Sequence, residues 1–308
     1  MFDSIFQDLK SYFRSGTMIS RIIIINGAVF LAIILVKIGL IFTGPDFPDK
    51  IAAFTRYIAI NESMWFNLKH PWVFVTHAFT HFGFFHILFN MLLLLWFGRI
   101  VGDLLGDKHV LPIYILGIIA GIVFFWISAN FISSGHQIAY GASAAVMAIV
   151  VAAGFTAPDY EMSLILIGPV RIKYIVLVLL ILDLLAVSNM SNTGGHLAHI
   201  GGAIMGGLVV SGLRNGYDLS TPVNQVISKI VSIFEPSERV STRRKNSPLK
   251  VSFKADERRA KSGRRTDDEG EQYSSSDRLD EILDKIKQKG IKSLSKEERD
   301  FLENQSKN

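Results

Sequence analysis

The chain of 308 residues contains no cysteine. This absence excludes disulfide bonds, thiolate metal ligands and a cysteine nucleophile. Basic residues are scarce in the first two thirds of the chain, because 21 of the 32 Lys and Arg residues lie from Arg214 onward. The positive net charge therefore belongs to the tail, and no nucleic-acid partner is predicted. Residues 1–20 also lack the short apolar core and small-residue cleavage site of a signal peptide.

Hydrophobic residues make up 49% of the chain, and they come in long blocks rather than in amphipathic periods. Such blocks are typical of a membrane protein with several spans. We therefore predict an all-α membrane protein whose six-helix domain covers residues 21–214. The predicted spans are residues 21–43, 84–105, 110–132, 143–157, 174–187 and 196–213.

The segments outside these spans differ in composition. Residues 1–20 form an N-terminal segment that fits an amphipathic helix at the membrane interface. Residues 44–82 form a long loop whose many aromatic residues place it partly in the interface. Residues 215–276 are predicted to be a disordered linker. Residues 277–303 fit two short amphipathic helices, a C-terminal module that could dock an unknown cytoplasmic partner.

The predicted orientation follows from basic residues close to the span ends. These residues precede span one, flank the turn between spans two and three, precede span five and follow span six: Lys10, Arg14, Arg21, Arg99, Lys108, Arg171, Lys173 and Arg214. Both termini are then cytoplasmic, and residues 44–82, 133–142 and 188–195 face outward. Lys50, Arg56 and Lys69 in the first outer loop go against this rule.

Ser143 stands between small residues at the head of an uncharged apolar segment that ends near Ala157. Fifteen helical residues span roughly 22 Å, less than a hydrocarbon core of ~30 Å, so Ser143 is expected below the outer surface. In the first turn of a helix, free N–H groups favour a developing negative charge. Ser143 is therefore a candidate nucleophile, and the alternative is a small residue that packs between helices.

His199 is the candidate base for this serine. His199, Gly202 and Gly206 fall on one face of span six, and a Gly-x-x-x-Gly face lets a neighbouring helix come close. An ionisable residue inside a span is a functional candidate, and the alternative is a packing histidine that makes a hydrogen bond. His196 lies one turn nearer the outer surface and is interpreted as a surface or packing residue.

His86 and Asn90 are four residues apart on span two, so they share a face. Their neutral side chains are good donors to an oxyanion. A competing metal site would use His81 and His86 with His196 and His199, but a His-Glu-x-x-His pattern is missing. We therefore predict no metal and no cofactor. Asp183 lies within span five. A third member of a catalytic triad is one interpretation, but nothing in the sequence places Asp183 near His199, so it is interpreted as a buried polar contact or an interface residue.

Three motifs together resemble the rhomboid intramembrane serine proteases: His77-x3-His81-x4-His86-x3-Asn90, Gly141-Ala142-Ser143 and Ala198-His199-x2-Gly202-x3-Gly206. The resemblance covers roughly residues 60–213. It implies a six-helix core, a Ser143–His199 catalytic dyad, and an oxyanion site from the Ser143 N–H, His86 and Asn90. It gives Gly141, Gly202, Gly206 and His81 structural roles. It also implies cleavage, within a lipid bilayer, of membrane-spanning protein substrates near their outer ends. The short C-terminal helical module resembles one found on some bacterial members, so the predicted location is a bacterial inner membrane.

Three positions depart from the pattern of the family. Ala144 follows the serine where a glycine is frequent, and Met147 stands where many members have a tyrosine that stacks on the histidine. Val73 follows Trp72 where a Trp-Arg pair is common. Two other functions stay open: a non-catalytic rhomboid-like protein that binds transmembrane helices, and a metal transporter lined by histidines.

Overall fold

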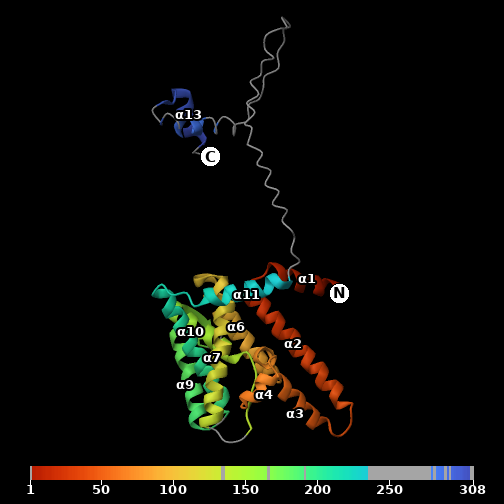
Figure 1. Cartoon of the computed structure of the whole chain (residues 1–308). Helices are drawn as coiled ribbons and strands as arrows, with labels where there is room; N and C mark the ends of the chain where they lie inside the picture. Colours follow the sequence, from red (N-terminus) through yellow and green to blue (C-terminus); the bar gives the residue numbers. More distant parts are fainter. Residues whose placement is uncertain are drawn as a thin grey trace. The chain divides into compact units, whose positions relative to one another are not determined.

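The computed structural model describes residues 2–132, 136–164, 167–190, 192–234, 279, 282–287, 290 and 293–305. The chain divides into two units, residues 1–240 and residues 241–308. The described part of the first unit is mostly helical (Figure 1). Its helices are α1 (Phe2–Ser15), α2 (Met18–Ile41), α3 (Phe47–Ile58), α4 (Met64–Lys69), α5 (Val73–Thr76), η1 (His77–Phe79), α6 (Phe84–Leu105), η2 (Asp107–His109), α7 (Val110–Phe131), α8 (Ser143–Thr156), α9 (Ile172–Ser188), α10 (Thr193–Arg214) and α11 (Ser220–Phe234).

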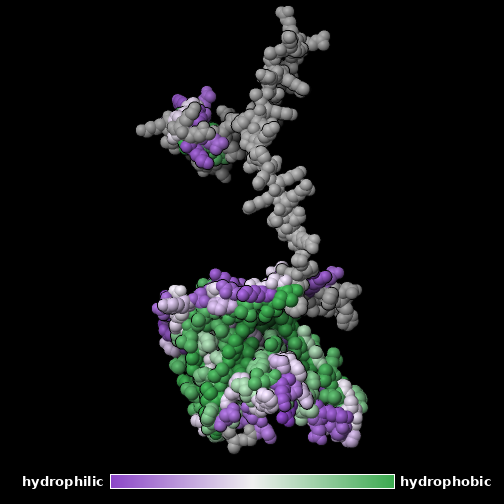
Figure 2. Space-filling model, viewed as in Figure 1, coloured by the Kyte–Doolittle hydropathy of each residue, from purple (hydrophilic) through white to green (hydrophobic). Residues whose placement is uncertain are grey.

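Four helices are long and apolar enough to cross a membrane: Met18–Ile41, Phe84–Leu105, Asp107–Phe131 and Thr193–Arg214. The apolar surface of this unit forms a band between two hydrophilic rims (Figure 2). Helix α8 has 14 residues and α9 has 17, so both are shorter than a usual span. The protein is therefore a helical membrane protein, and the six-span arrangement remains a prediction.

Helix α8 is the centre of the bundle. Every residue from 145 to 154 is buried, as expected for a helix that is apolar all round. Helices α6, α7, α9 and α10 all pack against it. The core is made of small and branched residues, and Ala148, Ile149 and Val150 of α8 are fully buried in it.

Glycines set the spacing of α8 from its neighbours on two sides. On α10, a Cβ added at Gly202 or Gly206 would overlap the carbonyl oxygen of Ala144 or Ala148. On α7, a Cβ added at Gly121 would lie 2.5 Å from the Cβ of Ala144. The backbones are therefore in direct contact, and each glycine makes room for the alanine opposite it.

Two short antiparallel sheets of two strands each occur among the described residues. Strand β1 (Ile60–Asn61) pairs with β2 (Ile138–Ala139), with Ile60 opposite Ala139. Strand β3 (Glu161–Leu164) pairs with β4 (Gly168–Arg171), with Met162 opposite Val170. The first sheet joins the segment before α6 to the segment that leads into α8.

Helices α1 and α11 lie at one end of the bundle, and α3 and α4 lie at the other (Figure 1). The turn around η2 ties the first end together, because the Asp107 carboxylate accepts a hydrogen bond from the Met18 N–H at 2.9 Å. At the same turn, His109 Nδ1 lies 3.0 Å from Ser220 Oγ, and Asn224 donates to the Lys108 carbonyl.

Two predicted segments differ from the structure. Residues 44–82 are not one irregular loop, because α3, α4 and α5 lie within them. The predicted disordered linker 215–276 is wrong for residues 220–234, which form α11 with an apolar residue at every third or fourth position. Asp218 caps this helix by accepting from the Ser220 N–H at 2.8 Å. The rest of the predicted linker, 235–276, lies outside the described residues.

In the second unit, helix α13 (Lys296–Gln305) begins at a capping box. The Glu298 carboxylate accepts from the Ser295 N–H at 2.7 Å, and Ser295 Oγ accepts from the Glu298 N–H at 3.3 Å. Lys285 bonds the same carboxylate at 2.7 Å, and Ile282 and Leu294 are buried. This unit therefore has a small packed core of its own.

The packing of α8 generates a prediction. Gly202→Ala and Gly206→Ala should each destabilise the protein by about 1–3 kcal/mol, because the added methyl group meets a backbone carbonyl that cannot move freely. Gly27→Ala on α2 is the matched control: its Cβ would meet open space, and stability should be equal or up to ~1 kcal/mol higher. Thermal unfolding in detergent measures the difference. Equal melting of Gly202→Ala and Gly27→Ala would contradict this account of the helix contact.

Candidate active site

Ser143 is the first residue of α8, and the turn before it is held from two sides. The Gly141 N–H donates to the His77 carbonyl at 2.7 Å, and the Ala142 N–H donates to His81 Nε2 at 3.2 Å. Gly141 has a φ of +115°, a conformation that favours glycine. A Cβ at this position would also lie 2.8 Å from His86 Cε1, so the ring of His86 rests against the turn. The histidine motif thus fixes where Ser143 begins its helix.

The tautomers of His77 and His81 follow from their hydrogen bonds. The Nδ1–H of His77 donates to the Val73 carbonyl at 2.7 Å, and that of His81 donates to the Phe79 carbonyl at 3.3 Å. The pKa of each imidazole is lowered from 6.5 to about 4, mainly by burial, and for His81 the nearby His86 contributes to this shift. Both side chains are therefore neutral at pH 7, and His81 Nε2 is free to accept from Ala142.

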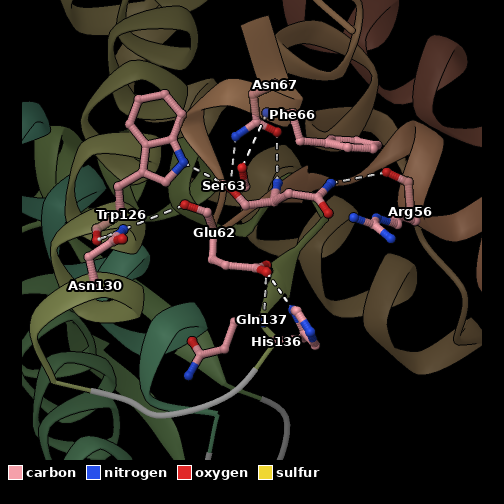
Figure 3. Close-up of polar contacts among 10 residues, drawn as sticks. Arg56, Glu62, Ser63, Phe66, Asn67, Trp126, Asn130, His136 and Gln137 are labelled. Carbon is pink, nitrogen blue, oxygen red and sulfur yellow. Dashed lines mark hydrogen bonds and ion pairs between the residues drawn. The ribbon is translucent and has the colours of Figure 1, made fainter. Parts of the chain in front are cut away.

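Polar contacts also connect residues 61–67 with α7 and with the segment that leads toward this turn (Figure 3). The side chain of Asn67 makes two hydrogen bonds to the backbone of Asn61: its Oδ1 accepts from the Asn61 N–H at 3.0 Å, and its Nδ2 donates to the Asn61 carbonyl at 2.7 Å. Trp126 Nε1 donates to the same carbonyl at 2.9 Å. The Glu62 carboxylate accepts from His136 Nδ1 at 2.8 Å and from the Gln137 N–H at 3.2 Å. Strand β2 is therefore tied to β1, which is itself bonded to α7, shortly before the chain reaches Ser143.

Burial raises the pKa of Glu62, but its bonds to His136 and to the backbone outweigh this effect and leave the pKa below its ordinary value of 4.5. The carboxylate is therefore charged at neutral pH, which favours both bonds to residues 136 and 137.

Ser143, His86 and His199 line two cavities at once. The outer cavity, of about 410 Å³, lies under β2 and is also lined by His77 and Gly121. The second cavity, of about 350 Å³, lies between α6 and α9. Its wall contains Phe85 and Phe89 from α6 and Leu179 and Leu182 from α9. The three polar side chains therefore stand where a polar cavity meets an apolar one.

Asn90 lines the second cavity, but its amide is partly engaged. One N–H of Asn90 donates to the His86 carbonyl of the same helix at 2.7 Å. The other N–H is the one that remains for a ligand, whereas the ring of His86 lies directly against Gly141. His86 is thus the better placed of the two predicted oxyanion donors.

The structure places Asp183 beside His199, which the sequence analysis did not foresee. Asp183 Oδ1 accepts from the Nδ1–H of His199 at 2.9 Å and from that of His196 at 2.7 Å. Its carboxylate is buried, with 9% of the side chain exposed. The interpretation of Asp183 as a buried polar contact fits, and the structure shows the contact with His199 that nothing in the sequence indicated. The available signal was an acidic residue within an apolar span.

Other predicted residues fall into place around this group. Met147 is buried one turn after Ser143 and lines the second cavity with His199. Gly202 and Gly206 face α8, as the Gly-x-x-x-Gly spacing indicates. His109 is buried at η2 against Ser220, at the far end of the bundle from Ser143.

The neutral histidines generate a prediction about pH. Below about pH 6.5 the unfolded chain binds protons at His77 and His81 that the folded protein does not bind until about pH 4. The free energy of unfolding should therefore fall as the pH drops from 6.5 to 4, by roughly 1–3 kcal/mol for each histidine, and stay level above 6.5. Unfolding midpoints in detergent at several pH values measure this slope.

The His77→Gln/His81→Gln double variant is the control for this slope. It should be less stable at pH 7, yet its stability should change less between pH 6.5 and 4 than that of the wild type. Parallel curves for the two proteins would show that other groups cause the acid sensitivity.

Comparison with known proteins places these residues in a family. Residues 68–215, which contain every residue of the two cavities except those of β1, match the family described as Rhomboid domain. Residues 270–308 match a family of unknown function, DUF6576.

A curated relative points the same way. RHOMBOID-like protein 12, mitochondrial, from Arabidopsis thaliana is 26% identical over 155 residues, which cover 46% of this chain and 46% of that protein. The chain thus spans about half the length of the curated relative that it matches. The part of the helical domain that spans residues 68–215 is therefore similar to the rhomboid family.

Proposed function

We propose that this protein is an intramembrane serine endopeptidase that cleaves transmembrane proteins. The observation that carries the proposal is the shared position of Ser143 and His199, which line both the polar outer cavity and the apolar cavity between α6 and α9. A serine and a histidine at such a boundary can meet a peptide bond that has left the apolar phase. Exposed Phe85 and Phe89 on one wall and Leu182 on the other suit an apolar substrate segment.

The proposed reaction uses the two side chains as nucleophile and base. His199 Nε2 takes the proton of Ser143 Oγ while the oxygen attacks the carbonyl carbon of the scissile bond. The resulting oxyanion accepts hydrogen bonds from the Ser143 N–H and from His86, with Asn90 as a further donor. His199 then returns the proton to the leaving amine, and a water molecule releases the acyl group from Ser143 by the same steps in reverse order.

The proposed orientation puts both termini on the cytoplasmic side and Ser143 toward the outer side. Support comes from α1 and α11, which lie at the same end of the bundle, opposite α3 and α4 (Figure 1). Lys108 and Arg214 lie at this first end, as the positive-inside rule requires. A bacterial inner membrane and a cytoplasmic partner for residues 277–303 remain predictions.

Cleavage assays test the proposal directly. Purified protein in detergent or liposomes is incubated with a panel of single-span substrates, beside Ser143→Ala and His199→Ala. Both variants should fold and lose cleavage, because each loses only the group that makes or activates the nucleophile. EDTA should not change the rate. Cleavage by folded Ser143→Ala would contradict a serine mechanism, and loss by EDTA with recovery by zinc would indicate a metal enzyme.

A substrate that binds the wild type without being cut would instead support the non-catalytic alternative. Crosslinking of the same panel, measured beside cleavage, separates the two results. Binding with no product at any pH between 6 and 9 would count against the endopeptidase.

The oxyanion donors generate a graded prediction. His86→Ala should lower kcat, because the loss of one oxyanion donor usually raises the activation barrier by about 2.7–4 kcal/mol. Asn90→Ala should cost less, because one of its N–H groups is already bonded to its own helix. KM should change little in both, since the oxyanion forms only during the reaction. An Asn90→Ala loss larger than that of His86→Ala would reverse the assignment of the main donor.

A further inference from the structure

The carboxylate of Asp183 contacts His199, the histidine that acts as the base in the proposed reaction. Asp183 belongs to α9, and His196 and His199 belong to the first two turns of α10. One oxygen, Oδ1, accepts from both imidazoles, at 2.7 Å from His196 Nδ1 and 2.9 Å from His199 Nδ1. Among the described residues that line the two cavities, Asp183 is the single acidic one.

These bonds determine the tautomer of His199. A carboxylate can only accept, so the proton of neutral His199 must sit on Nδ1, and Nε2 is left with a lone pair. That lone pair is what a serine hydroxyl needs from its base. The opposite tautomer would present an N–H to Ser143 and could not take its proton.

Met147 and His196 also lie near His199, but they are less suited than Asp183 to hold its imidazole by a hydrogen bond. Met147, which lines the same cavity, has a thioether that cannot hold an imidazole by a strong hydrogen bond. The ring of His196 stands edge-on to that of His199, with centroids 5.4 Å apart, and its Nδ1–H points to the same carboxylate. His196 thus helps to keep the carboxylate in place and does not itself bond His199.

We propose that Asp183 is a positioning residue that holds His199 in the tautomer and orientation of a general base and stabilises the imidazolium formed during the reaction. This inference rests on the proposed function and extends it from a pair to a Ser143–His199–Asp183 triad. Asp183 keeps its charge throughout, and the proton moves only between Ser143, His199 and the leaving group.

A bound metal is the competing explanation for the same three residues. Their ligand atoms lie within 4.8 Å of one another, which is close enough to hold an ion. However, two ligands at ~2.0–2.1 Å from a tetrahedral zinc are about 3.3 Å apart. The oxygen–nitrogen separations of 2.7 and 2.9 Å are shorter and are those of hydrogen bonds.

Asp183→Asn is the decisive variant, because asparagine has the same shape and can still link α9 to α10. It cannot supply the charge, and its amide can donate to Nδ1 and so favour the wrong tautomer. We expect kcat to fall at least about tenfold, toward the ~10⁴-fold loss known when a triad aspartate is replaced. KM should stay within about threefold, and labelling of Ser143 by a fluorophosphonate probe should slow in parallel.

Two matched variants control for the loss of charge and for the shared bond. Asp159→Asn removes an exposed carboxylate at the other end of α9, where it pairs with Lys173, and should leave kcat unchanged. His196→Gln removes the second donor and should cost less than Asp183→Asn. Thermal unfolding of each variant shows how much protein is folded.

Nitrogen chemical shifts of ¹⁵N-labelled histidine read the tautomer of His199 without any turnover. They should show protonated Nδ1 in the wild type, also in Ser143→Ala, and a mixture of tautomers in Asp183→Asn. This measurement holds even if the protein cleaves nothing, so failure of the proposed function and failure of this inference are distinguishable.

Three results would overturn the positioning role. Full kcat in folded Asp183→Asn, or an unchanged His199 tautomer, would leave the carboxylate a structural link only. An equal loss in His196→Gln would show that the three residues act as one structural unit. Loss of activity in EDTA with recovery by zinc would assign the three residues to a metal ion.

Discussion

The contact of α8 with α7 and α10 at backbone distance is the constraint on which the site depends. Gly202 and Gly206 press against the carbonyls of Ala144 and Ala148, and Gly117 and Gly121 face the methyl groups of the same two alanines. Such contacts fix both the depth and the rotation of α8, because neither side has a flexible side chain that could move aside. Ser143 precedes Ala144, and His199 lies one turn before Gly202. The glycine contacts therefore set the relative positions of Ser143 and His199, the proposed nucleophile and base. They also show how Ala144 fits, opposite Gly121 and Gly202, where the rhomboid pattern often has a glycine.

Apolar packing cannot by itself place the segment that enters α8. The segment 136–142 is short, and polar bonds hold it instead. Strand β2 pairs with β1, and Glu62 binds residues 136 and 137 (Figure 3). His77 and His81 bind residues 141 and 142. Each of these groups is directional, so the segment has one favoured path over the outer cavity. The site thus combines the rigid apolar packing of α8 with the polar segment 136–142, whose bonds depend on the charge state of Glu62 and the histidines.

Much of the helical core could be predicted from the sequence, and the reasons are physical. Long apolar runs with polar or glycine ends predicted the first and last residues of α6 as observed, and those of α7 and α8 to within one residue. Helix α11 was missed because its apolar stripe is one-sided and its 15 residues were averaged with the charged tail that follows. Asp183 was assigned no partner because its bonds join residues 13 and 16 positions away on another helix. Such a contact depends on how α9 and α10 cross, which no spacing in a single sequence reveals.

Asp183 also bears on how α9 is held in the bundle. Much of this helix faces outward, with Val178, Leu182 and Leu185 more than half exposed. A buried carboxylate is costly unless it is paired, and here two imidazole N–H groups on α10 satisfy one oxygen. The bond that orients His199 is therefore also a specific link between α9 and α10. Because α9 forms one wall of the cavity between α6 and α9, a displacement of α9 would carry the carboxylate with it. The orientation of His199, the proposed base, is thus coupled to the position of α9, which forms one wall of the cavity that we propose an apolar substrate segment enters.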